Sequence, residues 1–222
     1  MSEVAERFRR VSGRFGERVA EVPEDAWDRP APCEGWVARD ILRHMIVWMP
    51  DFMVASGGPA LADGPPVEQD PTGAWEALSG SLQAILDDPA QSAKEITHPQ
   101  AGTHSLESAI GMFFLGDILV HTWDLARATG LDETLDPDEV SGVLIGLQPV
   151  DEMLRASGHY GPKVEVPADA DEQTRLIAFT GRQPSRAGGS TPAGSTPSIV
   201  ATRSAVVIDV SVSSQNESRS VS

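Results

Sequence analysis

The spacing of the apolar residues constrains the fold of this chain more than any other feature. In residues 4–22 they recur at steps of three and four positions, as Val4, Phe8, Val11, Phe15, Val19 and Val22. This period places them on one face of an amphipathic helix. The same period returns within residues 37–52, 75–86 and 105–129. Four such helices must bury their apolar faces against one another, so the pattern predicts an all-α, four-helix bundle.

Proline and glycine indicate where the first four helices begin and end. The second helix is expected to start near Trp36, after a stretch that contains Pro30 and Gly35. The third is expected to close before Pro89, and the fourth to stop at Gly130. Residues 56–70, rich in glycine and proline, and the polar residues 90–104 are predicted to be connecting loops.

An additional C-terminal helix is predicted after the bundle. Asp136 followed by Pro137 is a favourable cap and first turn, and the helix is expected to reach about Arg155 with a kink at Pro149. An irregular segment should follow, ending near Arg182. We therefore expect one helical domain over residues 1–184, and a disordered tail over residues 185–222, which are rich in Ser, Thr, Gly and Pro.

The charge balance excludes several partners. The chain has 17 Lys and Arg against 33 Asp and Glu, a formal net charge of -16. Such a surface repels nucleic acids and anionic membranes, so neither is expected as a partner. The N-terminus lacks the apolar segment of a secretory signal, and we expect no later stretch to be long and apolar enough to span a bilayer. The single cysteine, Cys33, gives no sign of an oxidising compartment, and we expect a cytoplasmic protein.

The fourth predicted helix carries two polar residues on its apolar stripe. Asp117 and His121 continue the stripe that begins at Ile110 and Phe114, and their four-residue spacing projects both from one face. A buried carboxylate is costly unless it is paired or bound to a cation. His44, on the edge of the apolar face of the second helix, could point to the same place. Two imidazoles and a carboxylate form a three-ligand set for a divalent metal, zinc by preference, with nickel or iron as alternatives.

Other interpretations of these polar residues stay open. The three side chains could instead form a hydrogen-bonded network in the core. Asp124 could accept the second ring N–H of His121, or it could pair with Arg127. Cys33 is either a small buried hydrophobic residue or a reactive thiol. The remaining histidines, which are expected to be solvated in loops, are His98, His104 and His159.

Two stretches resemble a known family. Residues 30–44, PAPCEGWVARDILRH, resemble the signature PCxxWxVRDLxxH of the mycothiol-dependent maleylpyruvate isomerase N-terminal family, part of the wider DinB-like superfamily. Residues 117–130, DILVHTWDLARATG, resemble its second signature, and a later match runs through residues 166–170 and 179–182. The resemblance covers about residues 1 to 184. It implies a DinB-like four-helix bundle that holds a metal through His44, Asp117 and His121.

The resemblance favours one function, and a second stays open. The first is a metal-dependent transferase or isomerase that uses a small thiol such as mycothiol on a small electrophile. Its reacting sulfur would come from the cosubstrate, because no cysteine is expected near the site. The second is a non-catalytic metal-binding or sensor bundle that works through a partner. A homodimer is also left open, since no unpaired apolar stripe is long enough to predict one.

Overall fold

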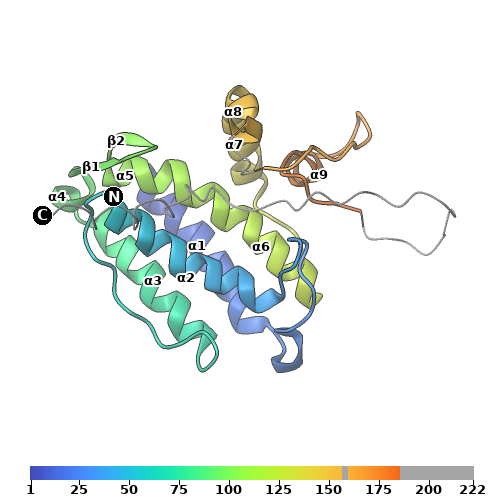
Figure 1. Cartoon of the computed structure of the whole chain (residues 1–222), viewed down its shortest axis with the longest axis horizontal. Coiled ribbons are helices and arrows are strands. Elements are labelled where there is room, and N and C mark those ends of the chain that lie inside the picture. The colour runs from blue at the N-terminus through green and yellow to red at the C-terminus, as the bar shows by residue number, and fades with distance from the viewer. Residues whose placement is uncertain (157–159, 186–222) are drawn as a thin grey trace, which may run out of the picture.

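The computed structural model describes residues 1–156 and 160–185, and four long helices lie side by side in it (Figure 1). They are α1 (Glu3–Glu21), α2 (Ala38–Ala55), α3 (Pro71–Asp87) and α6 (Leu115–Thr129). Helix α1 packs against α3 and α6, and α2 packs against the same two helices. The predicted helix bundle is confirmed. The tail predicted over residues 185–222 lies outside the described residues, except for Ser185.

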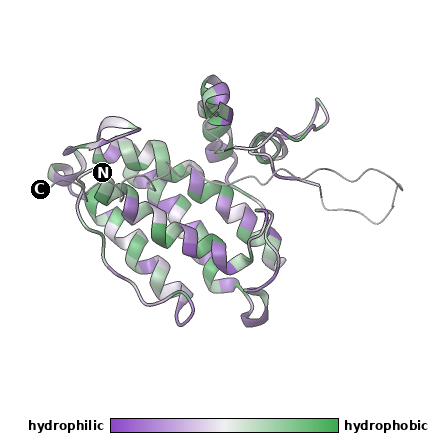
Figure 2. Cartoon of the chain, viewed as in Figure 1, coloured by the Kyte–Doolittle hydropathy of each residue, from purple (hydrophilic) through white to green (hydrophobic). Residues whose placement is uncertain are grey.

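The apolar stripes that predicted these helices form the core. Phe8 and Phe15 of α1 are fully buried, and the ring of Phe15 lies 4.5 Å from the ring of Trp75 on α3. Burying a side chain of this size contributes roughly 2–3 kcal/mol. Figure 2 shows the amphipathic character of the bundle helices, along which hydrophobic and hydrophilic residues alternate.

Side chains cap the N-termini of the bundle helices α1 and α3. Ser2 accepts a hydrogen bond from the backbone N–H of Ala5 at the start of α1, and Asp70 does the same for Gly73 at the start of α3. A short 3₁₀ turn, η1 (Glu24–Ala26), follows α1. Gly130 ends α6 with a φ of 82°, a left-handed conformation that favours glycine.

The fourth predicted helix is continuous but not uniform. It begins as α5 (Leu106–Ala109), passes through a π-helical segment η2 (Ile110–Phe114), and continues as α6. A π-helical turn inserts an extra residue and rotates the next part of the helix about its axis, and such turns are frequent at functional sites. Here the segment ends three residues before Asp117, so it sets which face of α6 the carboxylate occupies.

The predicted loop over residues 90–104 is wrong. It contains a short helix, α4 (Pro89–Ser92), and an antiparallel hairpin of β1 (Glu95–His98) and β2 (Gly102–Ser105). Four-residue strands are too short to show a clear alternating pattern, which is why the sequence did not reveal them.

The predicted solvation of the loop histidines is also wrong where the structure tests it. His98 is buried and stacks on Phe52 of α2, with ring centroids 4.8 Å apart, and His104 is half-buried. His159 lies outside the described residues.

The C-terminal part contains more helix than expected. The predicted fifth helix is divided around Pro149 into α7 (Pro137–Leu147), a 3₁₀ turn η3 (Gln148–Val150) and α8 (Asp151–Ala156), so the irregularity predicted as a kink is a 3₁₀ turn between two helices. The segment expected to be irregular contains α9 (Glu172–Phe179), which packs against α7 (Figure 1). A cap at Asp171 and the apolar face of α9 explain this short helix.

The core helix corrects one further expectation. The stretch Leu106–Thr129 is 24 residues long and apolar enough to cross a membrane by length and composition. However, 78% of its most apolar window is buried inside the bundle, which is how the core helix of a soluble protein behaves.

Candidate metal centre

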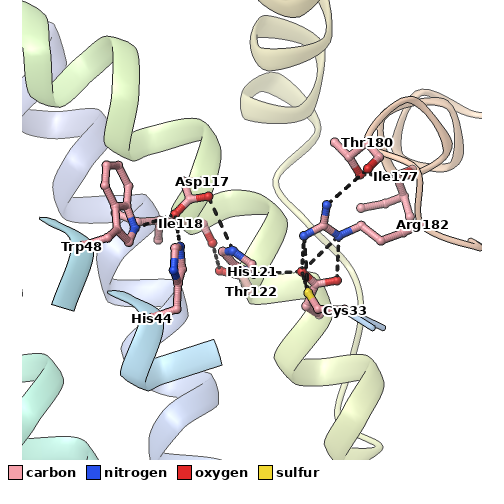
Figure 3. Close-up of polar contacts among 11 residues, drawn as sticks. Cys33, His44, Trp48, Asp117, Ile118, His121, Thr122, Ile177, Thr180 and Arg182 are labelled. Atoms are coloured by element: carbon pink, nitrogen blue, oxygen red, sulfur yellow. Dashed lines mark hydrogen bonds and ion pairs between the residues drawn. The ribbon is translucent and has the colours of Figure 1, made fainter. Parts of the chain in front are cut away.

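The three predicted ligands come together between two helices (Figure 3). His44 projects from α2, while Asp117 and His121 project from α6 one turn apart. The Nε2 atom of His44 lies 3.4 Å from Asp117 Oδ2, and the Nε2 atom of His121 lies 3.5 Å from Asp117 Oδ1. All three side chains are more than nine-tenths buried.

These separations suit a bound ion. Metal–ligand bonds of about 2.0–2.1 Å in a tetrahedral site place neighbouring donor atoms about 3.3 Å apart. The two nitrogen–oxygen separations are close to that value, and one donor atom from each residue lies within 4.8 Å of the others. In addition, His121 Nε2 is buried and makes no hydrogen bond within residues 1–156 and 160–185. A buried ring nitrogen without a hydrogen-bond partner is available to ligate a metal ion, so the residues fit the ion.

Two tryptophans surround the ligands. The indole Nε1–H of Trp48, one turn after His44, donates a 3.0 Å hydrogen bond to Asp117 Oδ2. The ring of Trp36, from the loop before α2, stacks near His121 at 6.0 Å and meets His44 at 5.3 Å. Trp36 is only half-buried, so it lies between the two imidazoles and solvent.

The second ring nitrogen of His121 faces another carboxylate. His121 Nδ1 lies 2.8 Å from Asp124 Oδ2, three residues later on α6. Asp124 in turn receives a bidentate contact from Arg182, with distances of 2.7 and 3.0 Å. The alternative pairing of Asp124 with Arg127 is wrong, because Arg127 instead binds Glu133 and covers the ring of Trp123.

The structure also corrects the expectation about cysteine. Cys33 is buried beside Asp124, with its Sγ atom 3.5 Å from Asp124 Oδ2 and 3.6 Å from an Arg182 nitrogen. Cys33, His121 and Asp124 form a second group that could hold a metal. The guanidinium of Arg182 already supplies the positive charge there, so the group of His44, Asp117 and His121 is the better candidate for an ion.

Without an ion, the protonation states of the two histidines and Asp117 set the charge of the site. Burial lowers the pKa of His44, against the opposing pull of Asp117. Burial acts on His121 in the same direction, but the carboxylates of Asp117 and Asp124 outweigh it and raise the pKa of His121 to about 10. The neighbouring imidazoles likewise outweigh burial at Asp117 and lower its pKa. The pocket therefore favours a positive charge beside Asp117, which a proton or a metal ion can supply.

Sequence reasoning missed three residues of this neighbourhood. Trp48 lay on the apolar face of α2, where an indole looks like ordinary core. Trp36 and Arg182 each lay within a stretch that carries the family resemblance, and that was the only sign of them. Arg182 is separated from Asp124 by 58 residues, so no local pattern could show the pairing.

The fold and the site together define a helical bundle protein with a buried His–Asp–His group that fits a divalent metal. The chain belongs to the mycothiol maleylpyruvate isomerase N-terminal domain family, whose profile matches residues 8–126. At a coarser level, this family belongs to the DinB-like superfamily. The matched region includes the three candidate ligands and Asp124, and it ends before Arg182.

Two similar curated proteins come from Mycobacterium tuberculosis. They are the uncharacterized protein MT0763 of strain CDC 1551 / Oshkosh and the uncharacterized protein Rv0738 of strain ATCC 25618 / H37Rv. Each is 26% identical to this chain over 180 residues, which cover 78% of this chain and 94% of the relative. No solved structure matches the chain.

Proposed function

We propose that this protein binds one divalent metal, preferably zinc, and uses a small thiol such as mycothiol to act on a small electrophile as a transferase or isomerase. The proposal includes cytoplasmic residence and small-molecule partners. The observation that carries it is the convergence of His44, Asp117 and His121, with a buried His121 nitrogen that lacks a hydrogen-bond partner in the described chain.

Three protein ligands leave a coordination position open, as in catalytic rather than structural zinc sites. The imidazoles of His44 and His121 offer nitrogen lone pairs, and Trp48 holds the carboxylate of Asp117 in place. A divalent cation, when bound, lowers the pKa of a thiol that coordinates it and so supplies a thiolate at neutral pH.

The charge of the ligand set favours an anionic cosubstrate. Two neutral imidazoles and one carboxylate carry a single negative charge, so a divalent ion leaves one positive charge in excess. Asp124 and Arg182 cancel each other and do not alter this balance. An uncompensated charge is costly in a buried site, and a thiolate would neutralise it. This argument supports a thiol over a neutral ligand.

The reaction balances without a redox partner. The thiol gives up its proton, its sulfur forms a bond to an electrophilic carbon, and a proton returns to the product. In a transferase the carbon–sulfur bond remains. In an isomerase the same bond breaks again and the thiol is released with its proton.

Metal content is the first test. The protein is purified without chelator or affinity-tag nickel, and elemental analysis is expected to find about one ion per chain. His121→Ala should lose that ion, whereas His104→Asn, a histidine of the hairpin, should retain it. An equal and low metal content in all three proteins would leave a hydrogen-bonded core network as the better description.

Thiol chemistry is the second test. The metal-replete protein is titrated with mycothiol by calorimetry, and then given mycothiol with maleylpyruvate as the electrophile. Binding that disappears in His121→Ala supports the proposal, and product formation identifies the reaction type. A metal-replete protein that neither binds mycothiol nor turns over the electrophile supports the non-catalytic sensor or interaction bundle instead.

A further inference from the structure

We propose that Arg182 is a positioning residue of the metal centre, which acts through Asp124 to fix the orientation of His121. This inference rests on the proposed metal site. It adds a residue outside the family-matched region, because the match ends at residue 126.

The contact between Arg182 and Asp124 is bidentate and buried. Arg182 Nε lies 3.0 Å from Asp124 Oδ1, and a terminal guanidinium nitrogen lies 2.7 Å from Oδ2. Asp124 is fully buried and Arg182 is 6% exposed. A planar guanidinium that meets both carboxylate oxygens fixes the plane of the carboxylate as well as its distance.

This orientation passes to His121. The oxygen of Asp124 that receives the shortest Arg182 contact is Oδ2, and the same atom lies 2.8 Å from His121 Nδ1. The carboxylate therefore holds Nδ1 on its own side of the ring and leaves Nε2 facing Asp117. Outer partners of this kind set the tautomer and the direction of a metal-binding histidine, and their loss typically weakens metal binding about 10- to 100-fold.

The packing of the C-terminal segment positions Arg182 beside Asp124. Arg182 lies three residues after the end of α9 and directly after Gly181, whose φ of 86° is a left-handed conformation that favours glycine. Figure 3 shows the Arg182 side chain reaching from this segment toward the end of the site near Cys33. Residues after the family-matched region therefore complete the site geometry.

The proposal is tested by zinc affinity, measured by competition with a chromophoric chelator. Arg182→Met is expected to weaken zinc binding about 10- to 100-fold, and Arg182→Lys to recover part of the loss, since it keeps the charge but not the fork. Arg127→Met is the matched control. Arg127 also contacts the C-terminal segment, at the carbonyl of Pro184, but it does not touch Asp124, and wild-type affinity is expected.

A double-mutant cycle separates positioning from a merely structural role. If Arg182 acts through Asp124, Arg182→Met should change zinc affinity by less than about twofold in an Asp124→Asn background. This double variant also leaves neither charge buried alone, which protects its folding. Additive losses in the cycle, or wild-type affinity in Arg182→Met, would overturn the proposal.

Metal-free protein gives a readout that is independent of the proposed function. The His121 Nδ1–H proton is followed by NMR in the presence of chelator. A slowly exchanging signal is expected in wild type and Arg127→Met, and rapid exchange is expected in Arg182→Met. An unchanged signal in Arg182→Met overturns the positioning role, whether or not the wild-type protein holds zinc.

Discussion

The indole of Trp48 donates its hydrogen bond to Asp117 Oδ2, the same carboxylate oxygen that lies 3.4 Å from His44 Nε2. Trp48 thus orients the carboxylate of Asp117, and His44, one turn earlier on the same helix, lies against the same oxygen. The hydrogen bond joins α2 to α6 at the candidate metal centre. The direction of the Asp117 carboxylate therefore depends on how these two helices pack.

Replacing Trp48 should therefore affect metal binding. Trp48→Phe keeps an aromatic ring but removes the donor, so zinc affinity is expected to fall about 10-fold, at the lower end of the effect of such outer partners. The measurement is chelator competition. Trp75→Phe is the matched control, because its indole donates to the Ser12 carbonyl away from the site. A similar loss of affinity in both variants would contradict a specific role for Trp48.

Removing the metal should destabilise the protein. An ion bound only by the folded state, at a free concentration of about 100 times its Kd, adds about 2.7 kcal/mol. For a domain of this size, that corresponds to a rise in Tm of roughly 5–10 °C. Calorimetry with zinc and then with chelator measures the difference. His121→Ala should show no shift, and a full shift in that variant would place the ion elsewhere.

The metal-free protein should lose stability as the pH rises. The pKa of His121 is about 10 in the folded state, above its value of about 6.5 in an unfolded chain. The folded state therefore keeps a proton that the unfolded state has released, and this stabilisation is complete below about pH 6.5 and lost as pH approaches 10. Between about pH 7 and 8.5, the free energy of unfolding should fall by about 1 kcal/mol per pH unit.

Denaturant titrations in the presence of chelator test this pH dependence. His121→Asn removes the titrating group and should flatten the profile over the same range. A wild-type profile as flat as that of the variant would show that His121 is neutral in the folded, metal-free protein.

Two glycines should respond to alanine in opposite directions. Gly130 has a φ of 82°, so Gly130→Ala is expected to destabilise the protein by about 1 kcal/mol. Gly13 lies on the exposed face of α1 with open space around it, so Gly13→Ala is expected to stabilise the protein by about 0.5–1 kcal/mol. Urea unfolding of both variants provides the measurement, and effects of the same sign would contradict the assigned backbone conformations.

Local patterns predicted the helices well and the short elements poorly. The long helices carry several turns of apolar period, and glycine or proline at their ends added clear boundaries, as at Gly130 and Pro89. The hairpin of β1 and β2 and helix α9 are only four to eight residues long. Elements of that length are stabilised by neighbours such as Phe52 and α7, and these contacts leave little trace in the local sequence.

The candidate ligands could be chosen from sequence because they break a pattern. Asp117 and His121 occupy apolar positions of α6, and the helical repeat alone places them one turn apart on a buried face. The meeting of His44 with these two residues, the hydrogen bond from Trp48 and the approach of Arg182 to Asp124 depend on how separate helices pack. The helical period acts over a few residues and can be detected in the sequence. Contacts between residues tens of positions apart form only when the helices pack into a core.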